Sequence, residues 1–177
     1  MEELELYHIS CKEYPIGKVP PLMGESIYHQ NTMKDDRKWI NDYLDLHNPK
    51  GSPSRKKSFY ACDSIANCKA LKSTVVKENC LPRIYRVKML NPAKVPMALV
   101  TYLFKLKEGH EFNSRIANEY WIPSFEWKFC EYLSEEMEII EEIQNNDKSL
   151  MGKLIFWGSN STSLLADDAL SAKTLFS

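Results

Sequence analysis

The 177-residue sequence contains no apolar run long enough to cross a membrane. A membrane-spanning helix needs about 18 or more consecutive apolar residues. The first residues, MEELELYH, are acidic, whereas a secretory signal begins basic and continues apolar. We therefore expect a cytoplasmic protein that neither crosses a membrane nor carries an export signal.

The chain also has no excess of basic charge. Its 23 Lys and Arg residues are balanced by 24 Asp and Glu residues, for a formal net charge of −1. This balance argues against binding duplex DNA through bulk electrostatics, because such proteins present a basic face. Charge is segregated locally, however, with a basic segment at 49–57 and six glutamates without a basic residue in 131–143.

The five cysteines, Cys11, Cys62, Cys68, Cys80 and Cys130, form no CxxC pair and are odd in number. This pattern favours free thiols in a reducing compartment over a disulfide framework or a zinc site. We expect no metal centre.

The residues that are present are typical of one globular domain over 1–177. Apolar residues make up 44% of the chain, charged residues 27% and aromatic residues 11%. A chain of this length buries about 70% of the surface that its unfolded form exposes. No repeat and no long linker divides it.

Apolar periodicity predicts a mixture of helices and strands, and hence an α+β fold. Two segments leave alternatives open. Residues 115–124 are ambiguous, and 127–143 fit either a helix, which the period favours slightly, or a strand, a turn and a second strand. The remaining expected elements are strands at 4–9, 58–62, 83–90, 97–106 and 152–158, helices at 35–48 and 63–75, and an amphipathic stretch at 161–176.

His8 stands between apolar neighbours on the first expected strand. Because strand side chains alternate, His8 shares a face with Leu4 and Leu6 and points inward. A buried imidazole needs hydrogen-bond partners, and most such histidines are satisfied core residues. The alternative is that His8 belongs to a site.

Three segments in order resemble the ADP-ribosyltransferase superfamily, in the branch that uses His, Tyr and Glu. They are LYHIS at 6–10, RKKSFYACDSIANC at 55–68 and FCEYLSEEMEIIEEI at 129–143. The signature of that superfamily is a polar residue on the first strand, an aromatic or Ser motif on a middle strand before a short helix, and a Glu on a later strand. The resemblance covers about 4–143 and leaves 144–177 as a C-terminal extension. It implies two packed antiparallel sheets with a few flanking helices.

The resemblance also implies roles for five residues, with NAD as a consumed substrate. Glu131 would stabilise the positive charge that develops on the ribose, and Tyr60 would stack on the nicotinamide. His8 would bond a ribose hydroxyl or the carboxamide, Ser10 would face the same side, and Arg55 would reach the pyrophosphate.

Each residue has a plainer interpretation. Tyr60 can be a core aromatic residue, Arg55 an exposed loop charge, and Glu131 a solvated carboxylate if 129–143 is helical. Glu119, Glu126 and Glu135 compete for the catalytic position, and Glu119 could act on the acceptor.

We therefore expect a mono-ADP-ribosyltransferase that acts on a macromolecule, either nucleic acid (RNA or DNA) or protein. The lack of a clear Glu-x-Glu or Gln-x-Glu pair argues against arginine as the acceptor. No Gly-rich βαβ unit is present, so NAD would not act as a hydride carrier. The SRKK loop at 54–57 and an exposed Trp121 would contact single-stranded nucleic acid.

Small members of this superfamily are often toxins of toxin–antitoxin or phage-defence systems, so an antitoxin protein could dock on 161–177. The alternatives are an inactive NAD-binding or partner-binding module and an RNA-terminal phosphotransferase.

Overall fold

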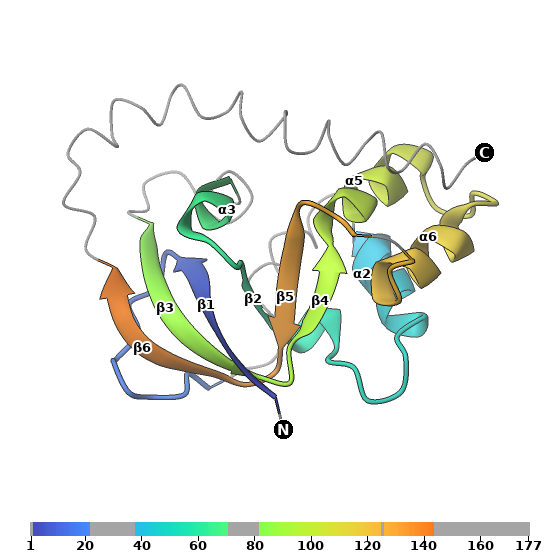
Figure 1. The fold of residues 1–177 in the computed structure, drawn as a ribbon. Coiled ribbons are helices and arrows are strands. Elements are labelled where there is room, and N and C mark those ends of the chain that lie inside the picture. Colours follow the sequence, from blue (N-terminus) through green and yellow to red (C-terminus); the bar gives the residue numbers. More distant parts are fainter. Residues whose placement is uncertain (1, 22–37, 71–81, 125, 144–177) are drawn as a thin grey trace.

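The computed structural model describes residues 2–21, 38–70, 82–124 and 126–143 (Figure 1). This part of the chain forms two three-stranded antiparallel sheets and four α-helices. The predicted α+β class with two antiparallel sheets is confirmed. The predicted strand at 152–158, the stretch at 161–176 and the extension 144–177 lie outside the described residues.

The first sheet has the strand order β1-β3-β6. The strands are β1 (Glu3–Ser10), β3 (Arg83–Leu90) and β6 (Met137–Ile143). One face is apolar, with Leu6 paired to Val87. The other face carries Arg86, whose guanidinium lies 3.2 Å from Glu5 and 2.9 Å from Glu141. This alternation is the half-buried strand pattern that the sequence predicted.

The second sheet has the strand order β2-β5-β4. The strands are β2 (Phe59–Ala61), β5 (Cys130–Ser134) and β4 (Ala93–Pro96). The slightly favoured helix over 127–143 is wrong, and the alternative of a strand, a turn and a strand is correct. Ser134 closes the turn, because its hydroxyl donates to the Leu90 carbonyl at 2.7 Å and accepts from the Glu136 amide at 3.1 Å.

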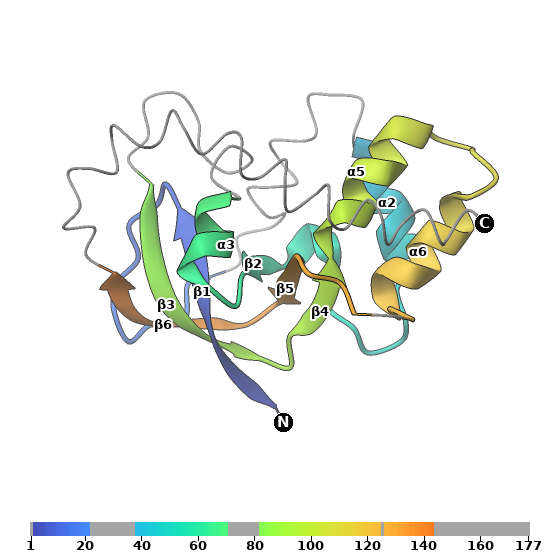
Figure 2. The ribbon, with the colours of Figure 1, turned by 45° about the horizontal axis from the view of Figure 1, so that its top comes forward.

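A single bridge joins the two sheets at their centre. The Tyr7 and Cys62 backbones exchange two hydrogen bonds of 2.8 Å, which places β1 next to β2. The six strands therefore run in the order β4-β5-β2-β1-β3-β6, with β1 and β2 adjacent where the two sheets meet (Figure 2).

Helices lie beside the second sheet (Figure 2). They are α2 (Lys38–Leu46), α5 (Met97–Leu106) and α6 (Asn113–Trp121). Their buried residues form one cluster with the sheet, which includes Leu44, Leu99, Ile116 and Leu133. Helix α2 confirms the described part of the helix expected at 35–48, and α6 settles the ambiguous segment as helical up to Trp121.

The strand predicted at 97–106 is wrong, because this segment is helix α5. Its buried residues are Ala98, Leu99, Val100 and Leu103, and the last three follow helical spacing. The segment is apolar almost throughout, so its periodicity cannot separate a buried helix from a buried strand.

The short helix α3 (Ile65–Ala70) follows β2 and packs on β1. The Cys68 thiol donates to the Tyr7 carbonyl at 3.0 Å, and Ile9, Cys62 and Phe129 are buried around it. Cys62, Cys68 and Cys130 form no disulfide bond, but Cys11 is disulfide-bonded, so the prediction of free thiols is wrong at Cys11.

The outer edge of β6 pairs with the loop that follows β1. The Gly17 amide donates to the Ile139 carbonyl at 2.7 Å, and the Ile139 amide donates to the Lys18 carbonyl at 3.2 Å. Gly17 has a φ of +71°, a conformation that a residue without Cβ adopts at little cost.

Candidate functional site

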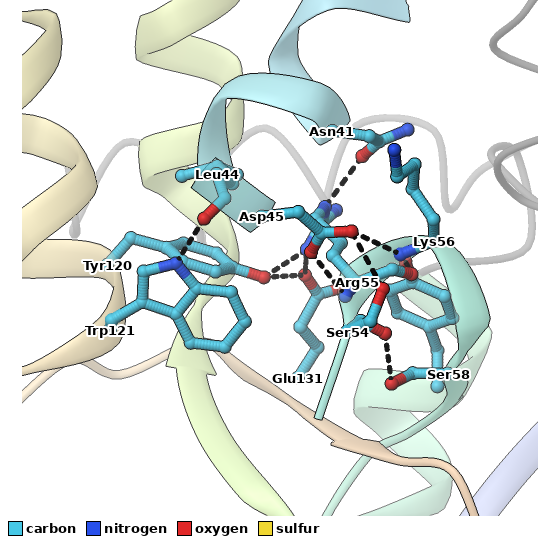
Figure 3. A network of polar contacts seen from close by, with 11 residues as sticks. Asn41, Leu44, Asp45, Ser54, Arg55, Lys56, Ser58, Tyr120, Trp121 and Glu131 are labelled. Carbon is cyan, nitrogen blue, oxygen red and sulfur yellow. Dashed lines mark hydrogen bonds and ion pairs between the residues drawn. The ribbon is translucent and has the colours of Figure 1, made fainter. Parts of the chain in front are cut away.

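Glu131 lies at the centre of a buried polar network beneath the helices (Figure 3). It is on β5 opposite Val95 of β4, and only 2% of its surface is exposed. Its Oε1 atom accepts hydrogen bonds from Arg55 Nη1 and from the Tyr120 hydroxyl, the latter at 3.1 Å. Among the described residues, both donors to the Glu131 carboxylate meet at this one oxygen.

Arg55 is fully buried, at 0% exposure, on the 3₁₀ helix η1 (Arg55–Lys57). Its backbone amide donates to Asp45 Oδ1 at 2.6 Å, and its Nε atom donates to Asn41 Oδ1 at 2.8 Å. Nη1 donates to Tyr120 and Glu131. The interpretation of Arg55 as an exposed loop charge is wrong, and a charge this buried requires such partners.

Two tyrosine rings flank the guanidinium of Arg55. The Cζ atom of Arg55 lies 5.3 Å from the ring centroids of both Tyr60 and Tyr120, which is cation–π distance. The Tyr60 hydroxyl donates to the Arg55 carbonyl. Tyr60 therefore contacts the network through its ring and its hydroxyl.

Tyr120 and Asn41 were missed by sequence reasoning. Burial raises the pKa of Tyr120 well above its ordinary value, an effect that the nearby Arg55 partly opposes. The phenol is therefore neutral and serves as a donor to Glu131. The one available signal was Asn41, a polar residue on the apolar stripe between Ile40 and Leu44. Tyr120 carried no such signal.

His8 bonds the backbone of β2 and not its side chains. Its Nδ1 atom lies 2.7 Å from the Tyr60 carbonyl, so Nδ1 carries the proton and donates. The Nε2 atom is buried and has no hydrogen-bond partner among the described residues. Burial lowers the pKa of His8, and the bond to Tyr60 opposes this with a smaller effect.

The side chains of His8 and Glu131 leave opposite faces of the strand array. The His8 ring lies on the same face as the Phe59 ring. The two ring centroids are 6.4 Å apart, in edge-to-face geometry. Tyr60 pairs with Leu133, two residues from Glu131, so Tyr60 and Glu131 share the other face. The structure thus brings Glu131, Tyr60 and Arg55 together, and connects His8 to them through the Tyr60 backbone.

Ser10 lies at the end of β1, on the His8 face. It is buried, and its hydroxyl accepts a hydrogen bond from the Lys12 amide at 3.0 Å. This contact caps the turn after the strand.

The competing glutamates have other environments. Glu119 accepts hydrogen bonds from the Ser124 amide and hydroxyl, the former at 2.9 Å, and from Trp127 Nε1 at 2.9 Å. It therefore fixes the chain that leaves α6. Glu135 accepts from the Ser54 amide at 3.0 Å, and Glu126 is exposed.

The expected nucleic-acid contacts are largely engaged elsewhere. Lys56 forms an ion pair with Asp42 at 2.9 Å, and Arg55 is buried. Trp121 is only 8% exposed and donates from Nε1 to the Leu44 carbonyl at 2.7 Å. The prediction of an exposed Trp121 is wrong, because this indole joins α6 to α2.

Within the ranges that the structure describes, no three His, Cys, Asp or Glu side chains converge as metal ligands. No helix in those ranges is both long and apolar enough to span a bilayer.

No protein-family model matches the chain, and no curated protein matches its sequence.

Proposed function

We propose that this chain is a mono-ADP-ribosyltransferase that consumes NAD and modifies a macromolecular acceptor. The observation that carries the proposal is the buried Glu131 carboxylate, held by Arg55 and Tyr120 beside Tyr60. The element order is also the one that the resemblance implies. His8 lies on β1, Tyr60 lies on β2 immediately before α3, and Glu131 lies on the later strand β5.

The chemistry requires a negative charge close to the ribose. Breaking the bond between the ribose C1′ and the nicotinamide nitrogen leaves that nitrogen with the bonding electron pair and the ribose with developing positive charge. A fixed carboxylate stabilises this charge in a water-poor site. The acceptor then bonds to C1′ and loses its proton, while neutral nicotinamide leaves.

In this proposal, the role of each residue follows from the face of the strand array on which its side chain lies. Glu131 acts on the ribose, and Tyr60, on the same face, offers its ring to the nicotinamide. Arg55 is engaged with Glu131, so a contact between Arg55 and the pyrophosphate requires the network to rearrange. His8 orders β2 through the Tyr60 carbonyl.

One observation favours a second candidate, a non-catalytic NAD-binding or partner-binding module. The ion pair between Arg55 and Glu131 gives the carboxylate a structural partner, as expected of a domain that keeps the fold but does not catalyse a reaction. No observation favours the RNA-terminal phosphotransferase. Its arginines would have to be available on several strands, but Arg83 and Arg86 form ion pairs with glutamates. The toxin–antitoxin or phage-defence setting and the antitoxin at 161–177 remain part of the first proposal.

The test is the release of nicotinamide from NAD labelled in the adenosine moiety, with total RNA, DNA or lysate protein as acceptor. We expect release, with transfer of the label to one acceptor class. Glu131→Gln is expected to lower the rate at least about a hundredfold, because it removes the charge that stabilises the transition state. Glu119→Gln is the matched control, since it neutralises a second buried carboxylate, one that supports α6.

Loss of activity in Glu131→Gln alone would support the transferase. Equal loss in both variants would indicate a general effect of burying a neutral amide. NAD binding by the wild-type protein without nicotinamide release would favour the module.

A further inference from the structure

We propose that Tyr120 and Arg55 are positioning residues that hold Glu131 by one oxygen and leave its second oxygen for a substrate hydroxyl. This inference rests on the proposed function, because it concerns the same carboxylate. It assigns a role to helix α6, which carries none of the three segments that resemble the superfamily.

The hydrogen bonds to Glu131 are asymmetric. Arg55 Nη1 and the Tyr120 hydroxyl both donate to Oε1, and no hydrogen bond among the described residues ends on Oε2. A carboxylate oxygen has two lone-pair directions, so two donors saturate Oε1. The arrangement leaves Oε2 as the acceptor for a hydroxyl of the ligand.

The two donors come from separate elements, and other contacts fix each of them. Arg55 on η1 is held by Asn41 of α2 through Nε and by Asp45 through its amide. Tyr120 belongs to α6 and is completely buried. The terminal torsion of a glutamate is broad, and two donors from separate elements that meet at one oxygen restrict it (Figure 3).

The plainer interpretation is that these contacts only satisfy a buried charge. That interpretation predicts a cost in stability and no specific change in turnover. A positioning role predicts lower turnover with nearly unchanged substrate binding, because an interaction made at the transition state is misaligned. The two interpretations therefore differ in kcat and not in stability.

The experiment compares Tyr120→Phe with Tyr85→Phe in the full chain. Tyr120→Phe keeps the ring beside Arg55 and removes the hydroxyl, which donates to Glu131 and accepts a hydrogen bond from Arg55 Nη1. Tyr85 is also completely buried, and its hydroxyl donates to the Lys12 carbonyl at 3.2 Å, so its removal measures the general cost of losing a buried phenol hydroxyl. The measurements are kcat and KM for nicotinamide release, and the unfolding equilibria of Tyr120→Phe, Glu131→Gln and the double variant.

We expect Tyr120→Phe to lower kcat about tenfold and to change KM for NAD less than about twofold. Tyr85→Phe should lose stability without loss of kcat. The effects of Tyr120→Phe and Glu131→Gln on the unfolding equilibrium constant should be non-additive by about tenfold, since the two groups share a hydrogen bond.

Three results would overturn the inference. If the wild-type protein is active and the two phenylalanine variants share one kcat, the network is structural and the proposed function stands. The same conclusion follows if Tyr120→Phe raises KM alone. If the wild-type protein releases no nicotinamide although the unfolding data show coupling, both the positioning role and the proposed function fail.

Discussion

At the scale of single residues, His8 shows how a buried imidazole can be only partly satisfied. One ring nitrogen donates to the Tyr60 carbonyl, and the other is buried without a partner in the described part of the chain. The sequence correctly predicted that His8 points inward, because the alternation of Leu4, Leu6 and His8 defines a face. It could not predict the partner, which lies 52 residues away.

The lowered pKa of His8 makes stability depend on pH. Because the folded state holds His8 neutral, the unfolded state binds the proton more tightly. The stabilisation that neutral His8 gives the folded state is fully present above pH about 6.5, the pKa of a histidine in the unfolded chain. It is lost as the pH falls through the lower pKa that His8 has in the folded state. We expect stability to fall by up to about 1.4 kcal/mol per pH unit in this window.

The measurement is urea denaturation between pH 7.5 and pH 4.5 for the wild type and His8→Asn. Asparagine retains an N–H donor for the Tyr60 carbonyl and does not titrate. The difference in unfolding free energy between the two proteins should therefore change with pH. Parallel pH profiles would show that His8 is not responsible.

Arg55 shows what the sequence could not reveal at the residue scale. Basic neighbours at Lys56 and Lys57 suggested a solvated loop, yet Arg55 is buried. Its partners Asn41, Tyr120 and Glu131 are 14, 65 and 76 residues away, so no local pattern links them. Long-range polar pairing of this kind is invisible to periodicity.

At the scale of elements, the strands with alternating patterns were predictable and the segments without a clear period were not. β1 and β3 alternate between an apolar face and a charged face, and both were found. Strand β5 is buried at every position, and helix α5 is apolar almost throughout; the slightly favoured helix over 127–143 and the strand predicted at 97–106 both failed. Their identities follow from tertiary packing, because β5 lies between β2 and β4.

The network around Arg55 connects α2, η1, α6 and β5, so its loss should affect all four. Arg55→Met leaves Glu131 as a buried charge without its cation, and we expect a cost of about 3–5 kcal/mol in unfolding free energy. Arg55→Met combined with Glu131→Met should recover most of this loss, since no charge stays buried.

Denaturant unfolding of the single and double variants measures both effects. A double variant no more stable than Arg55→Met would contradict this account, because the cost would then come from packing of the arginine and not from the unpaired carboxylate. The wild-type protein and Lys56→Met, which removes an exposed ion pair, provide the baseline.

At the scale of the whole molecule, the backbone bridge between Tyr7 and Cys62, the hydrogen bond from His8 to the Tyr60 carbonyl and a shared apolar cluster join the two sheets. The cluster contains Leu6 and Val87 from the first sheet and Phe59 and Tyr132 from the second. We therefore expect the described parts to unfold as one cooperative unit.

Cooperative unfolding can be tested with the Trp157→Phe variant. Its remaining tryptophans lie in or against the apolar cluster of the second sheet; they are Trp39, Trp121 and Trp127. Their fluorescence and the far-ultraviolet circular dichroism of the whole chain should change at the same denaturant concentration. Two separated midpoints would show that the bridge at Tyr7 and Cys62 does not couple the sheets.

The contact of Gly17 and Lys18 with Ile139 has a consequence for behaviour at high concentration. An open strand edge is a template for pairing with another molecule and so for aggregation. At the β6 end of the array, the loop hydrogen-bonds both backbone groups of Ile139, and the exposed Glu138 adds a charge next to it. This edge is therefore protected against joining a second copy into a longer sheet, and the loop after β1 contributes to keeping the protein dispersed.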